Sequence, residues 1–209
     1  MDNYFSKFWK KRSLIGNPDI SSHYKKDEAI KYDYKFVKKR LKKHHTVLDL
    51  GCGPMRLVSK ISKHCKHIDC VDFQKKYVST HKKYNNTKGY VSNVQDFIIK
   101  KKYDLIIIFG VFTFFNKRQI YKTIKNIEKM THIKSKILIK DQCGVKRDVF
   151  IDKHSDVVGS RYKAFYHYYK SSNKIFSKKF KTRIFTKLYP KRLNKFKNTK
   201  TVFFELKKN

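Results

Sequence analysis

An aspartate followed closely by two glycines is the most chemically informative pattern in this 209-residue chain. Residues 46–53 read Thr-Val-Leu-Asp-Leu-Gly-Cys-Gly, so Asp49 lies in a strand-like run and Gly51, Cys52 and Gly53 form the turn after it. Glycines in such a turn let the backbone approach a ligand, and a helix that follows presents its free amides there. The pattern predicts a nucleotide-like ligand, although many nucleotide-binding α/β proteins share a lone Gly-x-Gly.

Later residues narrow the choice of ligand. Asp72 lies 19 positions after Gly53 at the end of a second strand-like run, where a carboxylate can accept hydrogen bonds from ribose hydroxyls. The chain resembles the class I S-adenosylmethionine-dependent methyltransferases in a series of motifs that occur in the right order, at residues 47–54, 72, 92–97 and 103–107. An NAD-binding domain fits less well, because residues 51–56 lack the last glycine of Gly-x-Gly-x-x-Gly.

The resemblance implies S-adenosylmethionine as the cofactor and a role for each matching residue. Asp49 would bind the amino group of the cofactor, and Asp72 would hold its ribose. Met55 stands where the family usually has a third glycine, so we expect it to narrow the pocket, while an amide at Asn93 replaces a common aspartate. The other residues implied to contact the cofactor are Gly51, Cys52, Gly53, Phe73, Asn93, Val94 and Phe109.

Strand-like and helical patterns alternate over the rest of the chain. The expected strands are residues 46–50, 67–72, 90–92, 103–109, 136–140, 183–188 and 201–206, and the expected helices are 27–43, 57–64, 74–84 and 118–131. This order predicts an α/β fold with a doubly wound, mostly parallel seven-stranded sheet and helices on both faces. The tyrosine- and phenylalanine-rich insertion after the fifth strand is expected to form a helical or loop cap.

The length suits one domain with a single core. We divide it into an N-terminal helical segment (1–45), a cofactor-binding core (46–140), a substrate cap (141–182) and closing strands (183–209). No apolar run is long enough to span a bilayer, no signal sequence is recognisable at the start, and the four cysteines form no paired motif. These features favour a cytoplasmic protein with reduced thiols, and residues 64–70 lack the ligand spacing of a zinc site, so no metal is expected.

The methyl acceptor is expected over the ends of the fourth and fifth strands, beneath the insertion. Motifs of several nucleic-acid methyltransferases are missing after the fourth strand: the (Asp/Asn)-Pro-Pro-(Tyr/Phe) run, a nucleophilic cysteine and the aspartate of ribose 2′-O enzymes. Residues 142–149, 162–169 and 198–204 are faintly similar to methyltransferases of surface-polysaccharide pathways. The leading hypothesis is therefore O-methylation of a small molecule or sugar. The candidate bases for it are His154, His167 and Asp141, with Asp148 and Asp152 as further options.

The charge of the chain leaves other partners open. Lys and Arg number 52 against 16 Asp and Glu, a formal charge of +36, and only three residues are glutamate. Residues 157–204 contain no acid but interleave fourteen basic with twelve Phe or Tyr residues, which could hold RNA by phosphate contacts and stacking. An RNA methyltransferase is therefore the alternative, and a cofactor-binding module without activity is the second. Contact with an anionic membrane surface would also account for the charge. Codon bias could account for the many lysines, and the phenylalanines of the segment would then be core residues: Phe176, Phe180, Phe185, Phe203 and Phe204.

Overall fold

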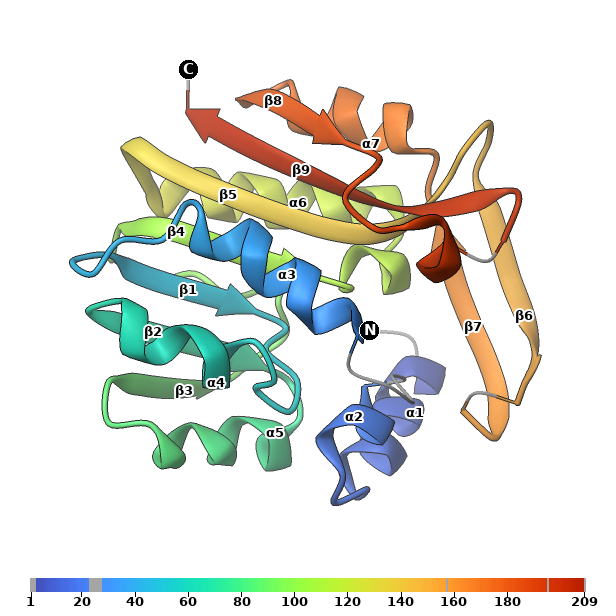
Figure 1. Cartoon of the computed structure of the whole chain (residues 1–209), viewed down its shortest axis with the longest axis horizontal. Helices are drawn as coiled ribbons and strands as arrows, with labels where there is room; N and C mark the ends of the chain where they lie inside the picture. The colour runs from blue at the N-terminus through green and yellow to red at the C-terminus, as the bar shows by residue number, and fades with distance from the viewer. Residues whose placement is uncertain (1–2, 23–27, 157, 195, 209) are drawn as a thin grey trace.

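The computed structural model describes residues 3–22, 28–156, 158–194 and 196–208, and a seven-stranded sheet runs through its centre (Figure 1). The sheet has the order β3-β2-β1-β4-β5-β9-β8, in which β1 to β5 are parallel and β9 is antiparallel to both of its neighbours. Its strands are β1 (Thr46–Leu50), β2 (His67–Asp72), β3 (Thr87–Val91), β4 (Tyr103–Phe109), β5 (Thr131–Gly144), β8 (Phe180–Phe185) and β9 (Thr199–Lys208). The α-helices are α1 (Asn3–Ser13), α2 (Pro18–Ser21), α3 (Glu28–Lys38), α4 (Val58–Ile61), α5 (Lys75–Ser79), α6 (Lys117–Lys129) and α7 (Tyr169–Phe176), with short 3-10 turns η1 (Ser62–His64), η2 (Thr80–Lys83), η3 (Phe112–Phe114) and η4 (Lys191–Leu193).

Both faces of the sheet are covered, which explains the near-continuous apolar sequence of its central strands. Neighbouring residues on a strand point to opposite faces, so Val47 packs in one core with α3 and α4, whereas Leu48 packs in a second core with α6 and α7. Helix α6 begins at a capping box, in which the side chain of Asn116 accepts from the Gln119 amide at 3.0 Å and the side chain of Gln119 accepts from the Asn116 amide at 2.8 Å.

The predicted mostly parallel α/β sheet is confirmed, with shifts at its ends. Strand β5 extends to Gly144 because it pairs with β9 along its whole second half. The third strand begins at Thr87, earlier than its short apolar run indicates, and the sixth ends at Phe185. The helix predicted over 27–43 spans Glu28–Lys38, and Asp27 lies outside the described residues.

The insertion after β5 is built differently from the helical or loop cap that we expected. Strands β6 (Val149–Ser155) and β7 (Ser160–Tyr166) form an antiparallel hairpin, and only α7 after it is helical. In β7 successive side chains alternate between the two faces: Tyr162, Ala164 and Tyr166 point inward, while Arg161 and Phe165 are exposed. This period of two fits a strand and excludes a helix.

The N-terminal helices lie beside this hairpin at the carboxyl end of the parallel strands (Figure 1). The Tyr4 hydroxyl donates to the carbonyl of Arg161, and the ring of Phe8 lies 6.1 Å from that of Tyr162. Trp9 meets Phe114 edge-on, with ring centroids 5.3 Å apart. Helix α1 and the β6–β7 hairpin together therefore form a cover over one edge of the sheet.

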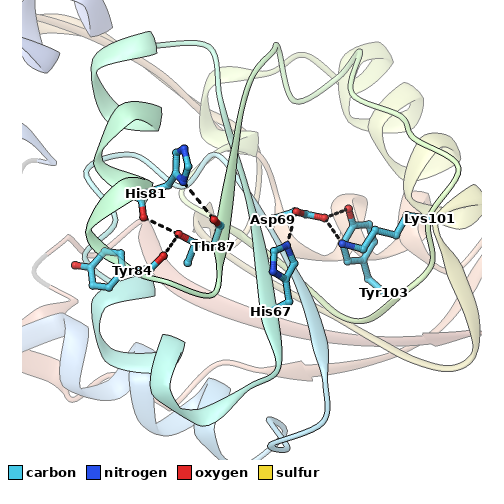
Figure 2. A network of polar contacts seen from close by, with 7 residues as sticks. All are labelled: His67, Asp69, His81, Tyr84, Thr87, Lys101 and Tyr103. Atoms are coloured by element: carbon cyan, nitrogen blue, oxygen red, sulfur yellow. Dashed lines mark hydrogen bonds and ion pairs between the residues drawn. The ribbon is translucent and has the colours of Figure 1, made fainter.

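A buried polar network connects β2 and β4 near the amino ends of the parallel strands (Figure 2). The carboxylate of Asp69 is fully buried and accepts from the Tyr103 hydroxyl at 2.6 Å, the Lys101 ammonium at 2.6 Å and the His67 ring at 2.9 Å. Burial opposes ionisation, but these hydrogen bonds outweigh it and lower the pKa of Asp69. Beside this network, the Thr87 hydroxyl donates to the carbonyl of His81 at 2.7 Å and so fastens η2 to β3.

We expect Asp69→Ala to lower the free energy of unfolding by about 3 kcal/mol, because it leaves the buried Tyr103 hydroxyl unpaired. The native pKa of Asp69 is lowered, so its stabilisation is complete above the unfolded pKa of about 4 and is lost as the pH falls through the lower native value. Urea denaturation at pH 7 and pH 3 measures both effects. Asp96→Ala, which removes an exposed ion pair with Lys122, is the control and should change stability by less than about 1 kcal/mol. Equal losses in the two variants would contradict the role of Asp69.

Candidate functional site

A cavity of about 480 Å³ opens at the carboxyl edge of the sheet. It lies where the strand order reverses, because β1 pairs with β2 on one side and with β4 on the other. Crevices at this position are the usual ligand sites of open α/β sheets. All nine residues that the sequence suggests for cofactor contact line this cavity: Asp49, Gly51, Cys52, Gly53, Asp72, Phe73, Asn93, Val94 and Phe109.

The glycine turn at the cavity has a backbone that other residues rarely adopt. Gly51 has φ +79° and Gly53 has φ +51°, both in the left-handed region. The amides of Gly51 and Cys52 donate to the Val71 carbonyl at 2.8 and 3.0 Å, which holds the turn against β2. A Cβ atom on Gly51 would lie 2.4 Å from a methyl carbon of Val111, whereas one on Gly53 would meet no atom within 4 Å. Position 51 therefore excludes a side chain by space as well as by conformation.

Met55 has a backbone conformation that favours glycine. Its φ of 60° is in the left-handed region, which is strained for a residue with a side chain. The side chain is 1% exposed and packs into the core formed with α3 and α4, and Met55 is not among the residues that line the cavity. Our expectation that Met55 narrows the pocket is therefore wrong, because its side chain points into the core.

Two carboxylates face the glycine turn. Asp72 accepts from the amide of Gly53 at 3.1 Å and from the amide of Gln74 at 2.9 Å, so it ties the end of β2 to the turn. Burial raises the pKa of Asp72 to about 6 even though these amides favour the ionised form. Asp49 is also buried, and burial together with the charge of Asp72 raises its pKa to about 7. Both groups titrate close to neutral pH in the free protein.

Asp141 lines the cavity and lies on β5, one residue beyond the part of that strand that pairs with β4. Its Oδ1 atom accepts from the amide of Thr113 at 3.3 Å, and Oδ2 has no hydrogen-bond partner among the described residues. Burial raises the pKa of Asp141 to about 8. Of the three candidate bases, Asp141 is the one that reaches the cavity.

The two candidate histidines do not line it. His154 lies on β6 with 68% of its side chain exposed, 3.9 Å from the carboxylate of Asp156. His167 is buried, and its Nε2 atom donates to the carbonyl of Phe115 at 2.7 Å. His154 occupies an outward-facing position on the hairpin and therefore does not reach the cavity. His167 lines a smaller void that Asp141 also lines.

Several cavity residues escaped the sequence analysis. A buried network joins Asp33 of α3 to Lys140 of β5 at 2.5 Å and to the Tyr189 hydroxyl at 2.6 Å. Asp33 interrupts the apolar face of its helix between Ile30 and Phe36, and this charged residue in an apolar stripe is the signal that could have revealed it. Further additions include Trp9 of α1, Thr113 and Phe114 of η3, Tyr162 and Tyr166 of β7, and Leu193 and Phe196.

The lining of the cavity is acidic in a strongly basic chain. Among the described residues, four carboxylates line it, at Asp33, Asp49, Asp72 and Asp141, but only two basic side chains do. Both of these are paired with carboxylates, Arg56 with Asp19 at 2.6 Å and Lys140 with Asp33 at 2.5 Å. The described residues bring no three His, Cys, Asp or Glu side chains together as metal ligands, and none of their helices is long and apolar enough to cross a membrane.

We expect Gly51→Ala to lower the free energy of unfolding by about 3 kcal/mol and Gly53→Ala by about 1 kcal/mol. Both changes strain the left-handed backbone, but only the first also drives a methyl group into Val111. Adding Val111→Ala should recover part of the loss at Gly51 and none at Gly53. Urea denaturation of the single and double variants measures this coupling, and equal losses at the two glycines would contradict the proposed clash.

Comparisons with known proteins agree with this geometry. A family described as a methyltransferase domain matches residues 47–133. No curated protein matches the chain in sequence.

A DhpI–SAH complex is 8% identical, with a TM-score of 0.72 over 97% of this chain and 94% of that one. The N-methyltransferase NodS from Bradyrhizobium japonicum, in complex with S-adenosylhomocysteine, is 11% identical, with a TM-score of 0.64 over 97% of each chain. A phosphoethanolamine N-methyltransferase from Haemonchus contortus, in complex with phosphoethanolamine and S-adenosylhomocysteine, is 12% identical, with a TM-score of 0.75 over 99% of this chain and 49% of that one.

At these identities the solved structures establish the shared fold, and the matched domain contains the glycine turn, both carboxylates beside it and Asn93. The matched methyltransferase domain and the shared fold together support the assignment of this chain to the class I S-adenosylmethionine-dependent methyltransferase superfamily, with S-adenosylmethionine as its cofactor.

Proposed function

We propose that this methyltransferase transfers the methyl group to a hydroxyl of a small neutral molecule or sugar that enters the cavity beneath the β6–β7 hairpin. One observation carries the proposal. The cavity extends from the glycine turn to an aromatic chamber, and among the described residues the two basic side chains that line it, Arg56 and Lys140, are each paired with a carboxylate. Such a chamber favours an uncharged acceptor over a phosphorylated one.

The residues at the glycine turn fit the cofactor. S-adenosylmethionine supplies, when bound, a methyl group activated by a positively charged sulfonium sulfur. Carboxylates at Asp49 and Asp72 line the cavity and suit a ligand with positive charge, and Asp49 would bind its amino group. Asp72 uses one lone pair of each oxygen on backbone amides and keeps acceptor capacity for ribose hydroxyls. Phe73, Asn93 and the Val94 amide would contact the adenine.

The acceptor chamber is lined by aromatic side chains from segments that are distant in the sequence. Trp9 comes from α1, Phe114 from η3, and Tyr162 and Tyr166 from β7. The ring of Phe114 packs against two of the others, 5.3 Å from that of Trp9 and 6.3 Å from that of Tyr162 between centroids. Methyl transfer depends mainly on orientation, so a rigid aromatic wall that holds the acceptor and excludes water supplies most of what this chain must contribute.

The RNA alternative has less support. The C-terminal phenylalanines Phe176, Phe180, Phe203 and Phe204 are at most 1% exposed and belong to the cores, so they offer no face on which a base could stack. In the described part of residues 157–204 the exposed phenylalanines are Phe165 and Phe196, and of these two only Phe196 lines the cavity.

Binding of S-adenosylhomocysteine should strengthen about tenfold as the pH rises from 5.5 to 8. Asp49 and Asp72, with pKa values of about 7 and about 6, are largely protonated in the acid range. Asp49 must ionise to bind the amino group well, and ionised Asp72 is the stronger acceptor for ribose hydroxyls. Their raised native pKa values also mean that ionisation lowers the stability of the free protein over the same range. Calorimetry at several pH values measures the affinity, and Asp49→Asn should flatten the dependence.

Asp96→Asn makes the same chemical change at an exposed position and should leave the affinity and its pH dependence as in the wild type. If neither S-adenosylmethionine nor its demethylated product binds, and Asp72→Asn changes nothing, the cofactor site is wrongly assigned.

Incubation with radiolabelled S-adenosylmethionine and fractionated cell extract should label the small-molecule or glycan pool. Asp72→Asn provides the blank, because it should weaken cofactor binding. Transfer should change little between 50 and 200 mM salt, since no unpaired basic residue lines the chamber among the described residues; binding to a polyanion would weaken by orders of magnitude over that range. Label in the RNA pool would replace this proposal with the RNA alternative, and label in no pool would favour a module without activity.

A further inference from the structure

Two adjacent cavity residues each have a buried polar atom without a hydrogen-bond partner among the described residues: Asp141 Oδ2 and Thr113 Oγ1. Asp141 is 5% exposed and Thr113 6%, and both line the main cavity. An unpaired buried polar atom costs about 1–3 kcal/mol, and here two occur together in a cavity wall. Their position indicates that a ligand with a hydroxyl or similar polar group supplies the missing partner.

The geometry of the pair is defined by the backbone. The Thr113 amide donates to Asp141 Oδ1 at 3.3 Å, which holds the carboxyl group against η3 and leaves Oδ2 as its free oxygen. Asp141 follows Lys140 at the end of β5, and the amide of Gly110 donates to the Lys140 carbonyl at 2.7 Å. The ends of β4 and β5 are therefore joined directly beside the carboxylate.

We propose that Asp141 accepts the proton of the acceptor hydroxyl during methyl transfer, that Thr113 Oγ1 holds the same hydroxyl, and that the proton leaves towards His167. This inference rests on the proposed function. The acceptor oxygen forms a bond to the methyl carbon, the methyl–sulfur bond breaks with its electron pair left on sulfur, and the hydroxyl proton passes to Asp141 Oδ2. No other reactant is needed.

A second void lies on the other side of Asp141. It measures about 10 Å³, near the smallest volume that holds one water molecule, and is lined by Asp141, Thr113, Ser172 and His167 among others. The His167 ring donates from Nε2 to the carbonyl of Phe115, so Nδ1 is its proton-accepting atom. One water in this void would connect the carboxylate that receives the proton to a group that can take it on.

The charges around Asp141 support a base at neutral pH. Lys140 and Cys143 flank it on β5, η3 contributes only backbone amides, and His167 faces it across the void. The Lys140 ammonium is paired with Asp33, which leaves burial as the dominant influence and raises the pKa of Asp141 to about 8. A cationic ligand in the same cavity favours the ionised form and moves this pKa towards the range in which a general base works.

The decisive comparison is wild type against Asp141→Asn, which keeps the shape of the side chain and removes the base. With the acceptor pool that takes the label, we expect kcat to fall about 10²–10⁴-fold while the affinity for S-adenosylhomocysteine changes less than about threefold. The acidic limb of the wild-type pH–rate profile should vanish in the variant. A wild-type rate with an unchanged profile in Asp141→Asn would overturn the inference while leaving the proposed function intact.

Two more variants separate the supporting roles. Thr113→Val keeps the volume and removes the hydroxyl, so it should raise the KM for the acceptor about tenfold with a smaller effect on kcat. His167→Gln should lower kcat several-fold and alter its solvent deuterium isotope effect without changing KM. His44→Gln, at an exposed position far from the cavity, is the matched control. Unchanged kcat and isotope effect in His167→Gln would remove the histidine from the route.

Proton release on cofactor binding tests Asp141 without the acceptor. At pH 7.5, binding of the sulfonium cofactor should release more protons than binding of its neutral demethylated product, because the positive charge ionises Asp141. Calorimetry in buffers of different ionisation enthalpy counts these protons, and Asp141→Asn should abolish the difference. Equal proton release in wild type and variant would contradict the assignment of Asp141. Failure of the wild type to bind either compound would instead overturn the proposed function, and this inference with it.

Discussion

The burial of carboxylates at the carboxyl edge of a parallel sheet is the constraint on which this structure depends. Asp49, Asp72 and Asp141 stand at or near the ends of β1, β2 and β5, and burial raises the pKa of all three. A buried carboxylate is costly unless amides or a cation compensate for lost hydration. The turns that follow the strands supply amides to Asp72 and Asp141, and the remaining capacity of these groups is directed to a ligand.

The rest of the chain encloses that edge. Helix α1 and the β6–β7 hairpin cover it, and α3 and the loop containing Tyr189 meet at Lys140 on the other face of the sheet. The turn after β1 is tight, and Gly51 in it has no room for a side chain. Met55 has a strained left-handed backbone, and the burial of its side chain offsets the cost of that strain. The cavity is thus a consequence of how distant segments close on a rigid edge.

The sequence could place the residues proposed to bind the cofactor at one cavity because each lies within or just after one strand. Asp72 ends β2, Gly51 and Asn93 come shortly after β1 and β3, and parallel pairing brings the ends of these strands to the same edge. The acceptor half depends on tertiary contacts. Asp33 meets residues 107 and 156 positions away, and no local pattern specifies those pairings. His154 was expected near the acceptor, but the hairpin register turns it outward, and a one-residue shift would have reversed that outcome.

The strong positive charge of the chain and the acidity of its cavity are compatible because they belong to different environments. Most lysines of the described residues are exposed, where solvent and salt screen their charges within about 10 Å, whereas the cavity carboxylates are buried, where the effective dielectric is lower. Lysine on the surface therefore attracts anions to the protein without preparing the reaction site for them. Under the proposed function, the aromatic wall and the unpaired polar atoms of Asp141 and Thr113 would select the acceptor, so its shape and one hydroxyl contact would matter more than the net charge of the chain.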